Sequence, residues 1–252
     1  MPVYSSIKGK KYNVSDIEIG SGGEGKICDI LNAANYVAKI YKPEEITREK
    51  EEKLKLLLSS FPNDPYGIFV PPLDILYDNG KFVGYVMSKK SGCRTFTNFY
   101  SENQRGGLPW SLFIEVAKTF ALAVSLIHKS ENIVIGDFNP ENFLIDSNNK
   151  KIYFIDTDAY HIKANNGYVF RCLKSFPDNT APELNEISFK DPSIKKTFTQ
   201  ETDLFSLATI IFSLLMNGAH PYNAPVTVGP SKSRSDFQLN LNIIKGYCAW
   251  YP

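Results

Sequence analysis

Two neighbouring stretches decide the fold of this chain: Ile133–Ile145, which reads IVIGDFNPENFLI, and Lys151–Asp158, which reads KIYFIDTD. Three polar side chains stand in this apolar setting, namely Asp137, Asn142 and Asp156. The intervening turn residues SNNK predict a hairpin that folds Asp156 back beside Asn142. Two acids and an amide oxygen that converge suit a hydroxyl nucleophile and a magnesium ion, because Mg²⁺ prefers hard oxygen ligands. The alternative is an ordinary loop, since Asp, Asn and Pro are common in turns.

Length, composition and charge set the first bounds. At 252 residues the chain can form one large domain or two small lobes, and a hydrophobic content of 43% is enough for a core. A net charge of +1 predicts no nucleic-acid or membrane partner, because neither surface attracts a near-neutral protein. The four cysteines stand far apart without CxxC spacing, which argues against zinc and disulfides and favours a reducing compartment. The N-terminus lacks the apolar core of a signal peptide, so we expect a cytoplasmic protein.

The first third of the chain is rich in predicted strands around a glycine turn. Residues 16–19 alternate as a half-buried strand does, and residues 27–30 and 36–41 also predict strands. The turn before residue 27 has GxGxxG spacing, which lets backbone N–H groups approach phosphate oxygens. Its residues are Gly20, Ser21, Gly22, Gly23, Glu24 and Gly25. Such a cluster also makes plain hairpins, but a dinucleotide fingerprint would require a helix next, and a strand is predicted instead.

Other segments give clear signals of their own. Residues 73–77 and 82–87 predict a hairpin across Asp-Asn-Gly, and residues 44–60 predict a helix. Residues 110–128 have apolar side chains at three-to-four spacing, which is typical of an amphipathic helix. Residues 204–216 are apolar nearly all round and too short to span a bilayer, so they predict a central, buried helix.

These motifs, in this order, resemble those of protein kinases from about residue 17 to the end of the chain. DFNPEN stands where kinases carry DLKPEN, DTD stands in place of DFG, and APE closes the segment that follows. The glycine turn followed by Val37-Ala-Lys also matches the kinase order. The sequence is most similar to an atypical bacterial branch of serine/threonine kinase-like proteins, through GSGGEG, IGDFNPEN, DTDAY and HPY.

The resemblance implies an α+β, two-lobed kinase-like fold. Residues 1–87 would form a small antiparallel β lobe with one helix, residues 88–92 a hinge, and residues 93–252 a mainly helical lobe. The chain stops before the last helices of such a lobe, so either it is truncated there or the lobe is abbreviated. A further C-terminal domain is therefore a candidate partner.

The resemblance also implies a role for each matching residue. Asp137 would be the catalytic base, Asn142 and Asp156 would bind Mg²⁺, and Lys39 would bind the α- and β-phosphates of ATP; the alternative for Lys39 is a surface lysine. A helix glutamate would orient Lys39, with Glu51 and Glu52 the first candidates and Glu49 left open. The other expected ATP contacts are the glycine turn, Ile27 and Ala38 above adenine, Met87, Ser88 and Lys90 at the hinge, and Leu144 beneath.

Three departures from the kinase pattern bear on activity. Ile135 and Gly136 replace the usual His and Arg, so a phosphorylated activation segment would find no docking cation at this point. Asn139 replaces the lysine on the transferred phosphate, and one such donor is worth roughly 2.7–4 kcal/mol in other enzymes, so transfer should be slow. Asp158 replaces a glycine, either as a second acid near the metal or as a turn cap.

The expected function is that of an ATP- and Mg²⁺-dependent protein kinase for Ser/Thr hydroxyls in bacterial signalling. Its substrate would be a protein, with the chain itself among the candidates. The alternative is a pseudokinase that binds nucleotide as a signalling scaffold; a small-molecule kinase is less favoured, because the APE segment suits peptide docking. The retained Lys39, Asp137, Asn142 and Asp156 favour catalysis, whereas Asn139 favours the scaffold.

Overall fold

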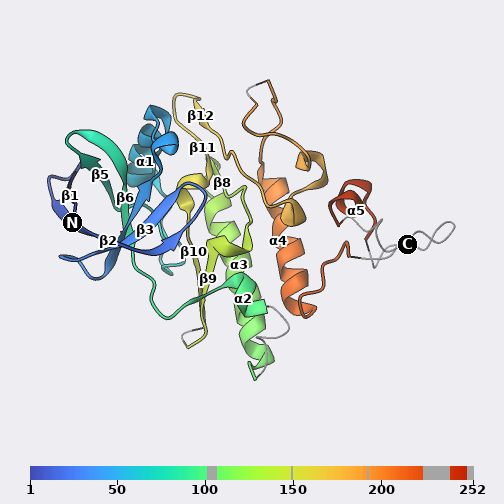
Figure 1. Ribbon diagram of the computed structural model, residues 1–252. Helices are drawn as coiled ribbons and strands as arrows, with labels where there is room; N and C mark the ends of the chain where they lie inside the picture. Colours follow the sequence, from blue (N-terminus) through green and yellow to red (C-terminus); the bar gives the residue numbers. More distant parts are fainter. Residues whose placement is uncertain (101–106, 149, 192, 224–238, 249–252) are drawn as a thin grey trace. The chain divides into compact units, whose positions relative to one another are not determined.

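The computed structural model describes residues 1–100, 107–148, 150–191, 193–223 and 239–248 (Figure 1). The chain forms two compact units. Unit 1 comprises Met1–Gly92 together with Ile155–Asp158, and unit 2 comprises Cys93–Phe154 and Ala159–Pro252. Unit 1 has more strand than helix and unit 2 has more helix than strand, which confirms the predicted α+β class. Residues 155–158 therefore belong with the N-terminal strands, although they lie far along the chain.

Unit 1 is built on a closed antiparallel barrel with strand order β1-β2-β3-β4-β6-β5. The first strand closes the ring because it pairs with both β2 and β5. The predicted strand at residues 36–41 is confirmed, while the strands on either side of the glycine turn are longer than predicted. The six strands are β1 (Val3–Ser6), β2 (Lys11–Ser21), β3 (Gly25–Ile30), β4 (Tyr36–Tyr41), β5 (Asp74–Asp78) and β6 (Lys81–Ser88).

The predicted hairpin between β5 and β6 is confirmed. Asn79 and Gly80 form its turn with φ of 48° and 80°, the left-handed values that a tight two-residue hairpin needs. Strand alternation gives each strand two faces, and one face of the barrel strands forms an apolar core. That core contains Tyr12, Val14, Cys28, Ile30, Ala38, Leu76 and Val86.

Helix α1 (Arg48–Ser60) begins four residues later than predicted. The Thr47 side chain accepts a hydrogen bond from the Lys50 backbone N–H at 3.1 Å, which caps the helix, and Pro43–Glu45 forms a separate 3₁₀ turn. Leu54 and Leu57 are buried, and α1 packs against β5 (Figure 1). The predicted helix is thus confirmed with a corrected start.

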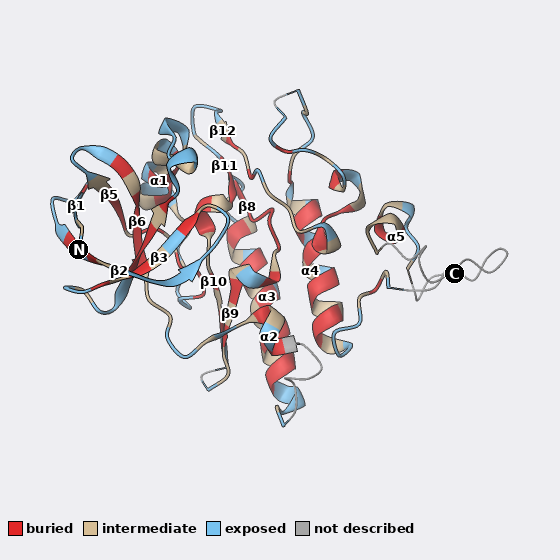
Figure 2. Cartoon of the chain, in the orientation of Figure 1, coloured by how far each residue is buried: buried red, intermediate tan, exposed pale blue. Residues whose placement is uncertain are grey.

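Unit 2 is organised around two helices that pack side by side, α3 (Trp110–His128) and α4 (Gln200–Leu215). Figure 2 shows buried residues along most of both helices. Helix α3 matches its predicted bounds, and α4 begins with a capping box between Thr199 and Thr202. By length and composition alone α3 could cross a membrane, a property that buried core helices share; in unit 2 it packs against α4 and β10 (Lys151–Phe154).

The remaining elements of unit 2 are short. One sheet has the order β10-β9-β7, and a second has the order β12-β11-β8. The hairpin predicted across SNNK is confirmed as β9 paired with β10, with Ile145 opposite Ile152. The other bounds are β7 (Arg94–Thr95), α2 (Phe96–Tyr100), β8 (Ile133–Val134), β9 (Phe143–Asp146), β11 (His161–Lys163), β12 (Val169–Phe170) and α5 (Leu239–Lys245).

Candidate active site

Strand alternation decides which β4 side chains accompany Lys39. Val37, Lys39 and Tyr41 share one face, and Lys39 lies directly opposite Ile27 of β3 and Tyr85 of β6. Ala38 points to the other face and is fully buried in the barrel core. The structure thus corrects the expectation that Ala38 shares a surface with Ile27. The β4 residue beside Lys39 on that face is Val37.

The amine of Lys39 is the centre of a buried ionic cluster in unit 1. Only 5% of Lys39 is exposed. Its Nζ is ion paired with Asp156 Oδ1, lies 3.0 Å from both carboxylate oxygens of Asp158, and lies 3.7 Å from Glu24 Oε2. Burial alone would lower the pKa of Lys39, but the carboxylates of Asp156 and Asp158 outweigh it and raise that pKa well above its ordinary value. Lys39 is therefore held as a cation.

The expected pairing of Lys39 with a glutamate of α1 is not what the structure shows. Glu51 accepts a hydrogen bond from the Tyr77 hydroxyl at 2.8 Å and is ion paired with Lys55 at 2.5 Å. Glu52 is ion paired with Arg48. The physical reason is that Asp156 and Asp158 already surround the amine, so the helix acids find partners elsewhere. Residue spacing on the helix could not reveal this competition.

The turn that carries the two acids has a special backbone. Asp156 has φ of 60°, in the left-handed region that non-glycine residues seldom adopt. The next residue, Thr157, is fully buried and donates a hydrogen bond from its hydroxyl to the Val70 carbonyl at 3.3 Å. Such a conformation persists where the surrounding contacts hold it in place. The DTD segment is thus bound to the rest of unit 1 through the hydroxyl group of Thr157 and through the carboxylates of Asp156 and Asp158.

Asp158 is the most completely bonded acid of the cluster. Tyr41 donates a hydrogen bond to its Oδ2 at 2.5 Å and Tyr85 donates one to its Oδ1 at 2.8 Å. Burial would raise the pKa of Asp158, but Lys39 and the two tyrosine hydroxyls hold it well below the ordinary value. Sequence reasoning missed both tyrosines. The spacing of Lys39 and Tyr41, two residues apart on one strand, was the available signal.

The glycine turn closes β2 onto β3. The Gly22 N–H donates a hydrogen bond to the Gly25 carbonyl at 2.9 Å, and the predicted residues Gly20, Ser21 and Gly23 are exposed. Glu24 is the exception, since its carboxylate reaches Lys39 and lies 3.4 Å from the Nζ of Lys50. Gly25 and Gly22 differ in the space available for a side chain. A Cβ at Gly25 would collide with the Ile40 carbonyl, whereas a Cβ at Gly22 would meet nothing within 4 Å.

These two glycines offer a matched test. We expect Gly25→Ala to lower the free energy of unfolding by about 1–3 kcal/mol, because β3 must move away from β4 to admit the methyl group. Gly22→Ala should change it by less than about 0.5 kcal/mol. Urea denaturation of both variants measures the difference. Equal stability of the two would show that the glycine spacing is not a packing requirement of the barrel.

The other expected nucleotide contacts lie on separate elements. Met87 is buried near the end of β6, and Ser88 ends that strand. Lys90 is half-buried in the segment that leads to Gly92, the last residue of the N-terminal part of unit 1. Leu144 is half-buried in β9 of unit 2.

Unit 2 carries the predicted catalytic loop. Asp137 is 7% exposed, and its carbonyl and Oδ2 accept hydrogen bonds from Asn142 Nδ2 at 3.3 and 3.4 Å. The Asn142 amide group is thereby oriented so that its oxygen is the atom left to bind a cation. Asn139 accepts a hydrogen bond from the Glu141 N–H at 3.0 Å and caps the 3₁₀ turn Pro140–Asn142. The structure therefore brings Asp137 and Asn142 together.

A fully buried acid of α4, Asp203, anchors that loop. Its carboxylate accepts hydrogen bonds from the N–H groups of Ile135 at 2.8 Å and Gly136 at 2.9 Å, and His128 Nε2 lies 3.0 Å away. Burial raises the pKa of Asp203, and these hydrogen bonds act against the rise. Two backbone donors thus hold the residues immediately before Asp137.

The packing around Gly136 explains why no arginine stands there. Gly136 has φ of 77°, and a Cβ at this position would lie 3.1 Å from the side chains of Cys172 and Phe198. Both side chains belong to an apolar cluster with Val134, Leu184 and Phe189. The segment after DTD is therefore held against the loop by apolar packing.

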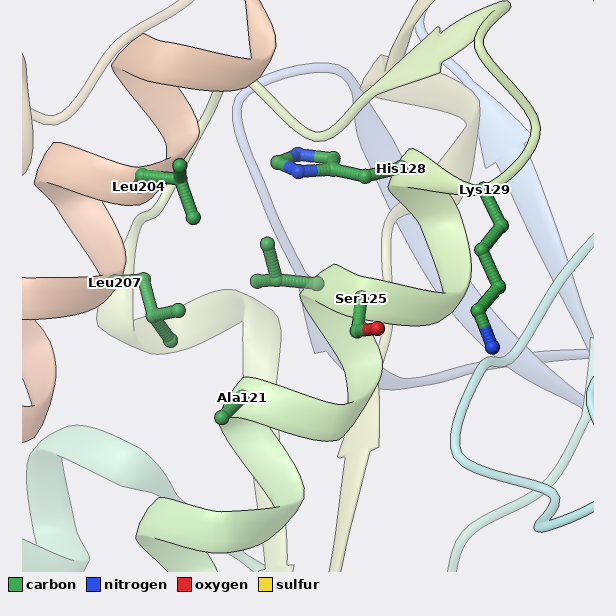
Figure 3. Close-up of a pocket in the computed structure, with 7 residues that line it drawn as sticks. Ala121, Ser125, His128, Lys129, Leu204 and Leu207 are labelled. Atoms are coloured by element: carbon green, nitrogen blue, oxygen red, sulfur yellow. The ribbon is translucent and has the colours of Figure 1, made fainter.

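A cavity of about 410 Å³ lies between α3 and α4 in unit 2 (Figure 3). The imidazole of His128 extends from α3 toward α4, and Leu204 and Leu207 of α4 also line the cavity. None of the predicted site residues lines it. The cavity is thus separate from the side chains that the sequence singled out.

Several carboxylates lie around Lys39 and Lys50, and they supply the oxygen atoms that Mg²⁺ prefers as ligands. The carboxylates are those of Glu24, Glu45, Asp156 and Asp158. Within the described ranges no three His, Cys, Asp or Glu side chains are grouped to hold a metal ion. A site with few protein ligands suits Mg²⁺, which keeps waters and phosphates in its shell.

Comparison with known proteins shows what the chain is similar to. It is 31% identical over 213 residues to the protein named Protein kinase YegI from Escherichia coli (strain K12), and equally identical to the YegI of Escherichia coli O157:H7. Each alignment covers 82% of this chain and 32% of the relative, so the chain spans about a third of the relatives' length. A weaker relative, 25% identical over 118 residues, is the "Probable serine/threonine-protein kinase irlE" of Dictyostelium discoideum, with 45% of this chain and 8% of that protein covered.

Comparison with a solved structure identifies the fold. The crystal structure of Rad53 1-466 in complex with AMP-PNP matches 97% of this chain and 56% of that chain, with a TM-score of 0.64 and 18% sequence identity. At this identity the match establishes the fold, which is kinase-like as predicted. No family model matches the chain.

Proposed function

We propose that this chain, which belongs to the protein kinase superfamily, is an ATP- and Mg²⁺-dependent protein kinase that phosphorylates Ser/Thr hydroxyls of a protein substrate. The observation that carries the proposal is the ion pair between Lys39 and Asp156, residues that are 117 positions apart. These are the two residues expected to bind phosphates and metal. A cytoplasmic location and a role in bacterial signalling are parts of the same proposal.

The proposed chemistry assigns one proton transfer to this chain. The substrate hydroxyl oxygen bonds to the γ-phosphorus of ATP, and the bond from that phosphorus to the bridging oxygen breaks, so that ADP leaves. The hydroxyl proton passes to the carboxylate of Asp137, the general base. Asn142 donates one amide hydrogen bond to Oδ2 of that carboxylate and one to the Asp137 main-chain carbonyl, which orients Asp137.

Binding of ATP and Mg²⁺ falls to the remaining residues. Lys39 would bind the α- and β-phosphates, and Asp156 and Asn142 are each proposed as an oxygen ligand of Mg²⁺. When bound, Mg²⁺ neutralises charge on the β- and γ-phosphates. For adenine we propose Ile27, Met87, Ser88, Lys90 and Leu144 as before, with Val37 in place of Ala38 because Val37 shares the face of Ile27.

Transfer of label from radioactive γ-labelled ATP to a general protein substrate, and to the chain itself, tests the proposal. Wild type should incorporate label with Mg²⁺ and not with EDTA. Asp156→Asn should lower incorporation by at least about 100-fold, the scale for losing one electrostatic contact to the reacting group. Asparagine also tolerates the left-handed backbone at this position, so the turn is kept. The control is Asp16→Asn, an exposed acid of the same unit that should retain full incorporation.

A nucleotide-binding scaffold is the second candidate, and the environment of Asn139 favours it. The side-chain oxygen of Asn139 is used to cap a turn, and the residue carries no charge for the transferred phosphate. A scaffold would bind ATP without transferring label, and neither Asp156→Asn nor Asp137→Ala would change its low background incorporation. Equilibrium binding of ATP measured beside the transfer assay separates the two candidates.

A further inference from the structure

The two roles expected of Asp158, a second acid near the metal or a turn cap, do not describe the contacts that its carboxylate makes. Both of its oxygens lie 3.0 Å from Lys39 Nζ, and each oxygen also accepts one tyrosine hydroxyl hydrogen bond. The Asp158 side chain is 1% exposed. Burying a carboxylate costs free energy unless cations and hydrogen-bond donors pair with it, and here one ammonium group and two hydroxyl groups do so. The surrounding side chains thus form a binding site for one carboxylate.

The donors that surround Asp158 come from one rigid surface. Lys39 and Tyr41 are two residues apart on β4, so alternation points both to the same face. Tyr85 of β6 is the cross-strand neighbour of Lys39 on that face. All three donors are therefore fixed by the hydrogen-bonded ladder of the barrel, and none of them belongs to a helix.

The acids of α1 are engaged differently. Glu51 bonds to Tyr77 of β5 and to Lys55, and Lys50 is ion paired with Glu45 at 2.8 Å. Glu52 is tied to Arg48, one turn before it on the helix surface. The acids Glu51 and Glu52 thus have partners other than Lys39, while α1 reaches the cluster through Lys50, which lies 3.4 Å from Glu24 and over the Tyr41 ring.

We propose that Asp158, and not a glutamate of α1, is the positioning residue that holds Lys39 for the phosphates of ATP. The inference rests on the proposed function for its catalytic consequence. It makes the orientation of Lys39 a property of the barrel and of the turn that contains Asp158. A displacement of α1 would therefore leave the direct contacts of Lys39 with Asp156 and Asp158 in place.

The first test needs no ATP and no activity. Pulsed modification of the folded protein with an amine-reactive reagent, followed by mass spectrometry, gives the rate at which Lys39 is modified. Asp158→Asn should raise that rate by about ten- to a hundredfold, the factor for one lost charged hydrogen bond. Glu51→Gln makes the same change of acid to amide on α1 and should leave the rate at the wild-type value. A rise in Glu51→Gln that equals or exceeds the rise in Asp158→Asn would overturn the proposal.

The second test measures phosphoryl transfer. Asp158→Asn should lower kcat by about ten- to a hundredfold, Tyr85→Phe should lower it less because Asp158 keeps its other partners, and Glu51→Gln should match wild type. Circular dichroism establishes whether each variant is folded. If Asp158→Asn does not fold, Tyr85→Phe takes its place in the comparison with Glu51→Gln. Transfer that falls in Glu51→Gln, with Asp158→Asn unaffected or faster, would assign the positioning role to α1.

The two tests separate this inference from the function on which it rests. If wild type transfers no label, the kinase proposal fails, while the modification series on Lys39 still decides whether Asp158 holds the amine. If wild type transfers label and the modification rates of Asp158→Asn and wild type are equal, the kinase proposal stands and the role of Asp158 is refuted.

Discussion

Replacing Asp137 with asparagine is expected to lower the rate of phosphoryl transfer by about 10²- to 10⁴-fold and to leave the dissociation constant for ATP close to its wild-type value. The rate should fall because the amide cannot accept the hydroxyl proton, and general-base catalysis contributes a factor of this size. ATP affinity should be retained because the proposed phosphate and metal contacts come from Lys39, Asn142 and Asp156. A loss confined to kcat is the pattern expected of an interaction made in the transition state.

The local geometry makes Asp137→Asn a clean substitution. Asparagine has nearly the same shape, and its side-chain oxygen can still accept the hydrogen bond from Asn142. Glu141→Gln is the matched control, because Glu141 is an exposed acid of the same loop and should keep the wild-type rate. Single-turnover transfer and equilibrium ATP binding are measured on the same preparations. A wild-type rate in Asp137→Asn would remove Asp137 from the reaction.

Asp203→Ala is expected to lower the free energy of unfolding of unit 2 by about 3–5 kcal/mol. The substitution leaves the buried N–H groups of Ile135 and Gly136 without the acceptor that holds them, and it also removes the contact with His128. Removing one partner of a buried, hydrogen-bonded charged group has an effect of this size. Because those two N–H groups directly precede Asp137, transfer should fall with stability even where the variant remains folded.

Urea denaturation followed by circular dichroism measures the Asp203 effect. The control is Leu204→Ala on the adjacent residue of α4, which is 51% exposed and should change the free energy by less than about 0.5 kcal/mol. Asp203→Asn should fall between the two, since one side-chain oxygen remains to accept a hydrogen bond. Stability of Asp203→Ala equal to that of Leu204→Ala would mean that the loop is held by other contacts.

Short-range patterns in the sequence were enough for most of the fold. The Asp-Asn-Gly turn, the strand at residues 36–41 and the amphipathic helix at residues 110–128 all match the structure, because each signal depends on residues within one element. The start of α1 was predicted too early, since Pro43 opens a 3₁₀ turn and Thr47 supplies the true cap. The error at Ala38 was avoidable, because period-two alternation separates it from Lys39.

The contacts within the candidate site could be predicted less well than the secondary structure. The order of motifs predicted that Lys39 and Asp156 serve one nucleotide site, but it predicted neither their ion pair nor the partners of Asp158. Nothing in the local sequence of DTD says that its last acid will meet two tyrosines from the barrel. Tyr41 and Tyr85 lie 117 and 73 residues from Asp158 along the chain.

Patterns in the amino-acid sequence were sufficient to predict the α+β class and the longer strands and helices, and they supplied the candidate site residues. They could do so because periodicity, turn residues and caps act between near neighbours. Which acids accompany Lys39, and why Glu51 and Glu52 do not, depends on tertiary packing. A buried ammonium group is attracted to every carboxylate within reach, so the outcome depends on distances that are set when β3, β4, β6 and the 156–158 turn pack together.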